Sequence, residues 1–237
     1  MKKHEHRIAS PKRYPIMKKE AHYIIKLGSG PHSKKDGIPL LLLMRDLLGI
    51  SKTRKEAEKV LNSGKISIDK RVIKDVKFPV GLMDSMSVLD DEYRFLYNTH
   101  GDVKLIKIDD KESAIKLCKI KDKSLIKKGK LQLHLHDGRN LLVDSNKYKP
   151  GDSIVISLPN QEIKKHLPCK KGMLVYITDG KHIGEIAEIF DFIEFPGSNP
   201  DKVILKLNED KFETLKKYIF VIGESKPELN LGEIYDN

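Results

Sequence analysis

The sequence contains no tryptophan and only two cysteines, Cys118 and Cys169. The two thiols lie far apart in the chain and neither belongs to a CxxC pair, so the spacing indicates neither a disulfide framework nor a zinc site. We therefore expect both cysteines to be reduced and partly buried, and we predict no metal site.

Long apolar runs are also missing. No segment approaches the roughly 18 consecutive apolar residues that a membrane-spanning helix needs. The first seven residues, MKKHEHR, are not followed by the apolar stretch of a secretory signal. These absences predict a cytoplasmic protein with no membrane partner.

Motifs for catalysis and nucleotide binding are lacking as well. Gly28-Ser29-Gly30 has neither the flanking strand and helix nor the third glycine of a dinucleotide-binding turn, and no GxxxxGK sequence occurs. No serine, cysteine or histidine stands in a recognisable nucleophile motif. We predict a protein that is not an enzyme, with no catalytic residues and no cofactor.

Positive charge, by contrast, is abundant and unevenly distributed. The formal net charge is +11, and residues 1–38 carry ten Lys or Arg against three Asp or Glu. Residues 190–237 carry six basic and ten acidic side chains. A strongly basic segment favours a polyanionic partner, because cations that neutralise phosphates release condensed counterions. We expect the N-terminal end to face nucleic acid; an ordinary solvated surface is the alternative.

The N-terminal segment, residues 1–37, is predicted to be an extended basic arm that orders on RNA. Its prolines and glycines interrupt any long helix, and its cations alternate with His and Tyr rings that can stack on bases. The basic side chains predicted to contact RNA here are Lys2, Lys3, Arg7, Lys12, Arg13, Lys18, Lys19, Lys34 and Lys35.

Residues 38–91 have the pattern of a small folded module. Pro39 followed by the apolar residues 40–48 predicts a short buried helix. Thr53-Arg54-Lys55-Glu56 predicts a capping box at the start of a second helix. Short strands follow, and Asp69-Lys70 is the expected turn between the first two of them.

This order of elements resembles the αL-type RNA-binding domain of ribosomal proteins, some pseudouridine synthases and bacterial tyrosyl-tRNA synthetases. The resemblance implies RNA contact near the start of the second helix and around the turn, by Lys52, Arg54, Lys55, Lys65, Lys70 and Arg71. The amides and dipole of a helix N-terminus attract phosphate, which supports the first three. Ordinary exposed charges are the alternative, and Lys70 departs from the domain, where glycine is common at that turn position.

Residues 92–168 show short strands separated by turns, which predicts a central β-rich domain. Asp137-Gly138 marks a hairpin. The alternating His134 and His136, together with Asp137, also have the pattern of a zinc-binding strand, but no third nitrogen or sulfur ligand is evident nearby in the sequence. We therefore assign these residues to a hairpin end.

Residues 169–223 are predicted to form a last β module, followed by an acidic tail at 224–237. Within this module residues 170–189 resemble a KOW motif, in which two strands flank a glycine-bearing loop. The resemblance implies an SH3-like barrel whose loop residues Gly180, Lys181, His182 and Gly184 are candidate RNA contacts. Because glycine lets two backbones approach closely, a purely structural hairpin is the alternative.

Over nearly its full length the chain resembles the S4e family of archaeal and eukaryotic small-subunit ribosomal proteins. The residues that carry this resemblance are dispersed along the chain and include Lys3-His4, Arg7-Ile8-Ala9, Pro11-Lys12, Gly30-Pro31-His32, Pro79, Gly81, Met83, Asp84, Leu96-Tyr97, Thr99, Gly101, Lys116-Leu117-Cys118-Lys119, His136-Asp137, Thr178, Gly180, Gly184 and Phe220-Val221-Ile222-Gly223. The acidic end at Asp236-Asn237 favours an archaeal-type member.

The resemblance implies an α+β, mostly β protein, with an αL-type module followed by small antiparallel β modules. It also implies a structural protein that binds the 5′ domain of small-subunit rRNA directly, beside neighbouring ribosomal proteins, as a monomer within the subunit. Two other functions remain open. An accessory module of an RNA-modifying enzyme would need a catalytic domain that the remaining residues do not indicate, and a KOW-type transcription elongation factor would not explain the αL-type module or the basic arm.

Overall fold

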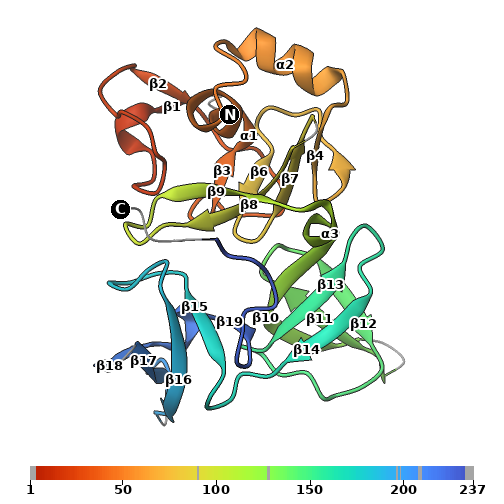
Figure 1. The fold of residues 1–237 in the computed structure, drawn as a ribbon, viewed down its shortest axis with the longest axis vertical. Helices are drawn as coiled ribbons and strands as arrows, with labels where there is room; N and C mark the ends of the chain where they lie inside the picture. Colours follow the sequence, from red (N-terminus) through yellow and green to blue (C-terminus); the bar gives the residue numbers. More distant parts are fainter. Residues whose placement is uncertain are drawn as a thin grey trace. The chain divides into compact units, whose positions relative to one another are not determined.

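The computed structural model describes residues 4–89, 91–126, 129–195, 197, 199–207 and 210–232, and the chain divides into two compact units. Unit 1 comprises residues 1–96 with 102–116, and unit 2 comprises residues 97–101 with 117–237. Both are built largely of short antiparallel strands, as the predicted α+β, mostly β class requires (Figure 1). The finer five-part division of the chain stays a prediction.

Within the described residues, unit 1 contains a five-stranded sheet of order β5-β4-β7-β8-β9, two two-stranded sheets, β1-β2 and β3-β6, and three short α-helices. Its elements are β1 (His4–His6), a 3-10 turn (Arg7–Ala9), β2 (Tyr23–Ile25), β3 (Gly37–Pro39), α1 (Leu40–Leu42), a π-helical turn (Leu43–Leu47), α2 (Arg54–Asn62), β4 (Ile66–Ile68), β5 (Arg71–Val72), β6 (Pro79–Gly81), β7 (Ser85–Val88), β8 (Asp91–Tyr97), β9 (Val103–Ile108) and α3 (Asp110–Ser113).

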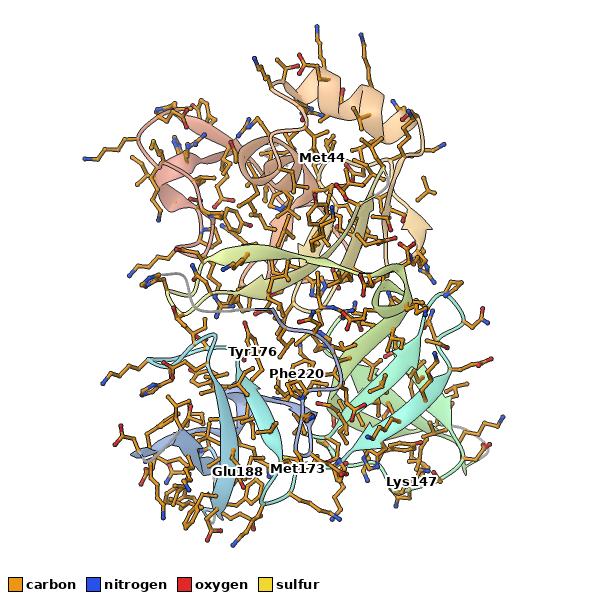
Figure 2. All side chains as sticks on the ribbon, in the orientation of Figure 1. Met44, Lys147, Met173, Tyr176, Glu188 and Phe220 are labelled. Carbon is orange, nitrogen blue, oxygen red and sulfur yellow. The ribbon has the colours of Figure 1, made fainter. Side chains whose placement is uncertain are left out.

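Both predicted helices of the first module are present. The first begins directly after Pro39 and is buried throughout α1; Met44, in the π-helical turn that continues it, is fully buried and lies among the packed side chains of the unit in Figure 2. The second begins with the predicted capping box: the Thr53 hydroxyl accepts from the Glu56 amide at 3.3 Å. In return, the Glu56 carboxylate accepts from the amides of Lys52 and Thr53, and these bonds lower the pKa of Glu56.

The turn between β4 and β5 shows why Lys70 can stand where glycine is common. Asp69 and Lys70 have φ angles of 51° and 61°, so both residues adopt the left-handed conformation of a tight hairpin turn. The Asp69 carboxylate accepts from the Ser85 amide at 3.1 Å and from the Lys116 ammonium at 2.7 Å. These hydrogen bonds of the Asp69 side chain hold the turn in place. They offset a backbone conformation that is unfavourable for residues other than glycine.

A buried cluster of charged side chains lies at the centre of unit 1. The Lys116 ammonium contacts Asp69 at 2.7 Å and Asp84 at 2.5 Å, and the His32 ring lies 2.9 Å from Asp84. The Gly81 amide also donates to Asp84 at 2.9 Å. Burial by itself would raise the pKa of Asp84, but the neighbouring His32 and Lys116 outweigh it and hold that pKa well below its usual range.

Residues 4–37 differ from the predicted extended arm, because the described part of this segment folds within unit 1. β1 pairs with β2, and the Arg7 guanidinium donates to the Met17 carbonyl and to Glu20, both at 2.7 Å, which braces the intervening loop. The buried Tyr14 donates its hydroxyl to the Gly37 carbonyl at 3.0 Å. Prolines and glycines do exclude a long helix here, but long-range side-chain contacts give the segment a compact conformation instead.

Unit 2 contains two five-stranded antiparallel sheets, of order β12-β11-β10-β13-β14 and β18-β17-β16-β15-β19, the second curled into a half-barrel (Figure 1). Their strands are β10 (Ile115–Leu125), β11 (Leu131–Leu135), β12 (Asn140–Val143), β13 (Ser153–Ser157), β14 (Ile163–Leu167), β15 (Leu174–Ile177), β16 (Ile186–Ile193), β17 (Lys202–Leu207), β18 (Asp210–Leu215) and β19 (Ile219–Gly223), the last preceded by a 3-10 turn at Lys216–Tyr218. The predicted hairpin around Asp137-Gly138 joins β11 to β12 and is confirmed.

Polar contacts link separate segments of unit 2. The Lys119 ammonium donates to the carbonyls of Lys217 and Ile219 at 2.9 and 2.6 Å, and burial lowers the pKa of Lys119 to about 8. Tyr176 is fully buried; its hydroxyl donates to the Tyr97 carbonyl at 2.7 Å and accepts from the Tyr97 amide at 2.9 Å. Figure 2 marks Tyr176 and the buried Phe220 of this unit.

Among the described residues, no helix has both the length and the apolar character that crossing a membrane demands. The apolar residues 40–44 at the start of the first helical segment are buried inside unit 1.

Replacing Lys116 by methionine should destabilise unit 1 by about 3–5 kcal/mol, because Asp69 and Asp84 would remain buried without their cation. The free energy of unfolding, measured by urea denaturation followed by circular dichroism, checks this expectation. Lys121→Met is the matched control, since Lys121 lies on the same strand and is exposed. Equal stability of the two variants would show that the buried cluster is dispensable.

Candidate nucleic-acid interface

Exposed basic side chains follow one side of α2. Lys52 and Lys55 lie at its start, and Lys59 lies one turn further along; all three are exposed. Lys55 and Lys59 are four residues apart on the helix and share one of its faces, while Lys52 lies just before the N-cap Thr53; we call these three lysines the basic face. The sequence analysis missed Lys59, although its position four residues after Lys55 was the available signal.

Arg54 and Lys70 are more engaged within the protein than the rest of this predicted set. The Arg54 guanidinium pairs with Glu58 at 2.8 Å, although both side chains are exposed. Lys70 is partly buried and its ammonium pairs with Glu92 at 2.7 Å. Lys65 and Arg71, by contrast, are exposed near the β4–β5 hairpin, beyond the C-terminal end of α2. The nine-residue helix itself is roughly 13 Å long.

The predicted contacts of the N-terminal segment fall into three groups. Lys2 and Lys3 lie outside the described residues. Lys12, Lys19 and Lys35 are exposed, as is Lys34, which pairs with Glu5. The remaining three, Arg7, Arg13 and Lys18, are buried or partly buried. The Arg7 side chain is only 4% exposed, so its position indicates a structural role within unit 1.

Two residues of the predicted KOW-like loop, Gly184 and His182, pack closely against other residues of unit 2. A Cβ atom added to Gly184 would lie 2.4 Å from the Asn98 carbonyl oxygen, so this position admits only glycine. The His182 ring pairs with Glu185 at 2.8 Å and stacks on Phe212 with 4.0 Å between ring centroids. Gly180 and Lys181 are exposed. The geometry thus favours a structural role for Gly184 and His182 and leaves Lys181 at the surface.

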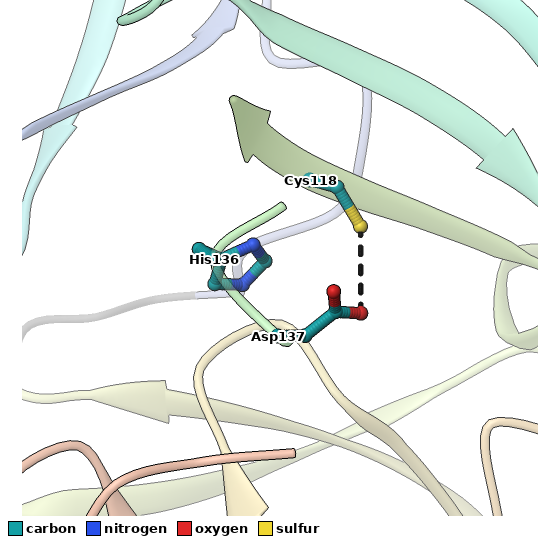
Figure 3. Close-up of side chains that lie close together, drawn as sticks. All are labelled: Cys118, His136 and Asp137. Atoms are coloured by element: carbon teal, nitrogen blue, oxygen red, sulfur yellow. Dashed lines mark hydrogen bonds between the residues drawn. The ribbon is translucent and has the colours of Figure 1, made fainter. Parts of the chain in front are cut away.

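The strongest group of metal-ligating side chains in the described part of the chain is Cys118, His136 and Asp137 (Figure 3), whose donor atoms lie within 4.8 Å of one another. The Cys118 thiol donates to Asp137 at 3.8 Å, and Arg139 pairs with the same carboxylate at 3.2 Å. The His136 Nδ1 accepts from the Lys119 amide at 3.3 Å. These contacts fit a hairpin end that is fixed by hydrogen bonds, as the sequence interpretation assumed.

His134, the other half of the predicted histidine pair, has separate partners. Its ring contacts Ser124 at 2.9 Å and Asn140 at 2.7 Å, on the sheet itself. Cys118, which the sequence analysis did not connect with this hairpin, reaches it because β10 pairs with β11. The alternating histidines therefore do not form one cluster.

Comparison with known proteins finds similarity along almost the whole chain. Residues 89–163 match the family described as "Ribosomal family S4e", and residues 46–85 match the S4 domain. The small ribosomal subunit protein eS4 of Methanocaldococcus jannaschii is 41% identical, with 97% of this chain and 98% of that relative covered. The eS4 of Methanothermobacter thermautotrophicus is 40% identical, with 97% and 96% covered.

A solved structure agrees with these sequence matches. The crystal structure of the 30S ribosomal protein S4e from Thermoplasma acidophilum superposes with a TM-score of 0.71 at 31% identity, covering 80% of this chain and 96% of that one. The S4-domain match includes α2, the β4–β5 hairpin and the basic face. The resemblance inferred from dispersed residues and from the αL-type module is confirmed.

Replacing Gly184 by alanine should destabilise unit 2 more than replacing Gly180 does. Both glycines have positive φ angles, 82° and 97°, so each substitution introduces backbone strain of about 1–3 kcal/mol. Only at Gly184 does the new methyl group also collide with backbone, which adds roughly another 1–3 kcal/mol, whereas the nearest atom at Gly180 is 3.8 Å away. Thermal unfolding of both variants measures the difference, and equal shifts would contradict the close approach to Asn98.

Proposed function

The chain belongs to the S4e family of ribosomal proteins, and on that basis we propose that it is a structural constituent of the small ribosomal subunit that binds rRNA directly. The curated relatives at about 40% identity are named small ribosomal subunit proteins. The family is structural, so the proposal gives the chain no catalytic step. Its place is the ribosome in the cytoplasm.

The observation that carries direct RNA binding is the exposed cationic surface of the S4 domain. Lys55 and Lys59 lie on one face of α2, Lys52 lies just before its N-cap, and Lys65 and Arg71 follow its C-terminal end. Ammonium and guanidinium groups placed on and beside a helix roughly 13 Å long can contact several phosphates of RNA.

The mechanism depends on side-chain charge more than on the end of the helix. In α2 the capping box uses the Thr53 hydroxyl and the Glu56 carboxylate at the first turn, which puts a negative charge where a phosphate would bind to helix amides. The helix N-terminus is therefore a weaker anion site than the sequence alone suggested. The lysines of the basic face are therefore the stronger phosphate contacts.

The proposal also names specific binding partners for this surface. We assign the 5′ domain of small-subunit rRNA as the RNA partner, neighbouring ribosomal proteins as further partners, and a single copy of the chain per subunit. Lys12, Lys19 and Lys35 supply a second group of exposed cations within unit 1. An RNA-modifying enzyme module or a transcription elongation factor is disfavoured, because the relatives that match over nearly the full length are ribosomal proteins.

Replacing Lys55 and Lys59 together by alanine should weaken binding to a 5′-domain rRNA fragment, without changing the unfolding temperature. Because each lost phosphate contact removes counterion release, the slope of log K against log salt should fall by about one per contact, thus by about two. A salt-titrated binding assay with tRNA as competitor measures both the affinity and the slope.

The matched control is the double variant Lys164→Ala and Lys165→Ala, which removes two exposed lysines from β14 in unit 2. An affinity of the Lys55 and Lys59 variant that equals the wild type would contradict the basic face. If tRNA displaces the wild-type protein as readily as the rRNA fragment itself does, the chain is only a general binder of RNA, and specific assembly is wrong.

A further inference from the structure

We infer that unit 1 carries a second kind of RNA contact, an exposed pad of three aromatic rings on which unpaired nucleobases stack. The pad consists of His6, His22 and Tyr23, and it deepens the proposed function, on which it rests. It differs from the basic face in what it recognises, since the basic face contacts phosphates and the pad contacts the flat surfaces of bases.

The three rings touch one another across the β1–β2 pair. In the register of these strands His6 lies opposite Tyr23, and the Arg7 amide donates to the His22 carbonyl at 3.0 Å. The ring centroids are 5.0 Å apart for His6 and His22, 5.1 Å for His6 and Tyr23, and 4.4 Å for His22 and Tyr23. His6 and Tyr23 are inclined to each other by 38°, whereas His22 meets them edge-on at 81° and 89°, so the three rings form a contiguous aromatic cluster in which a base would stack on an exposed ring face.

This aromatic surface faces solvent. Tyr23 is 50% exposed, and both histidines are exposed. Two further apolar side chains from the same segment are among the most exposed in the described residues: Ile8 at 74% and Met17 at 77%. Single exposed apolar side chains are ordinary, but a cluster of three exposed rings in mutual contact marks a candidate binding surface.

The pad is held in place before any partner arrives. Beneath it, Ile24 is 5% exposed and anchors β2 in the unit. Arg7, which follows His6, donates to Met17 and Glu20 and so fixes the loop that returns the chain to His22. A rigid pad loses little conformational entropy when a base stacks on it, which favours binding.

The charge around the pad selects an anionic partner. Between residues 4 and 25 the carboxylates are Glu5 and Glu20, and these pair with Lys34 and Arg7 respectively. Exposed lysines at positions 12 and 19 remain in the same segment. Exposed rings in a segment that also carries exposed cations match single-stranded nucleic acid, in which each nucleotide offers a base face and a phosphate. The partner is therefore a loop, bulge or unpaired stretch of RNA, and a duplex should not use the pad, since its bases are already stacked.

The absence of tryptophan from the chain allows a direct test. Tyr23→Trp introduces a single tryptophan at an exposed site and keeps an aromatic ring in the pad. Its fluorescence should be quenched when a 12-nucleotide single-stranded RNA is added and should stay unchanged with an RNA duplex of the same length. Unchanged fluorescence with single-stranded RNA, at concentrations where filter binding shows the complex, would overturn the pad.

A second measurement separates stacking from charge. Tyr23→Thr removes the ring but keeps a side chain suited to a strand, and it should weaken binding of the single-stranded RNA by about fivefold or more. The salt slope should remain that of the wild type, because no phosphate contact is lost. Tyr23→Phe, which retains the ring, should bind like the wild type.

Phe190→Thr is the matched control, because Phe190 is 47% exposed on unit 2 and does not belong to the pad. If Tyr23→Thr and Phe190→Thr weaken binding equally, the effect is not specific to the pad and the inference is overturned. Its failure differs from failure of the proposed function: in the first case the wild type still binds the 5′-domain fragment, and in the second it does not.

Discussion

The ion cluster of Lys116 with Asp69 and Asp84 is the interaction on which unit 1 depends. Its members come from a turn after β4, a turn before β7 and the start of β10, and His32 adds the N-terminal segment. Taking these groups out of water is costly, and the cost is offset only while every partner is in place. The cluster therefore ties together four separate stretches of chain, and it fixes the module that presents the basic face.

The local parts of this fold follow from local sequence. The capping box at Thr53 and Glu56, the helix after Pro39 and the hairpin at Asp137-Gly138 each depend on residues a few positions apart, and each is present. The compact N-terminal segment was not foreseen, because it depends on Arg7 reaching Glu20 and Tyr14 reaching Gly37. Contacts between residues this far apart leave no periodicity for a sequence pattern to reveal.

The candidate site, like the fold, could be predicted from the sequence only in part. The exposed lysines of α2 follow from helical spacing, but a basic residue that is drawn inward cannot be told from its neighbours by sequence, as Arg7 and Lys70 show. The dispersed residues of the family resemblance have a different explanation. Many of them meet inside the protein: His32, Asp84 and Lys116 in unit 1, and Cys118, His136 and Asp137 in unit 2. The residues that best identified the family thus mainly maintain its fold, whereas the surface that we propose for RNA binding consists of less distinctive lysines.

The contact between His32 and Gly81 has a consequence for how such a sequence can change over time. A Cβ atom at position 81 would lie 2.4 Å from the imidazole ring, and the ring itself is tied to Asp84. Neither position can accept a larger residue alone: a side chain at 81 requires a smaller one at 32, and losing the imidazole deprives Asp84 of a partner. The two positions, which are 49 residues apart in the sequence, therefore constrain each other. A substitution at one of them is disfavoured unless the other changes as well.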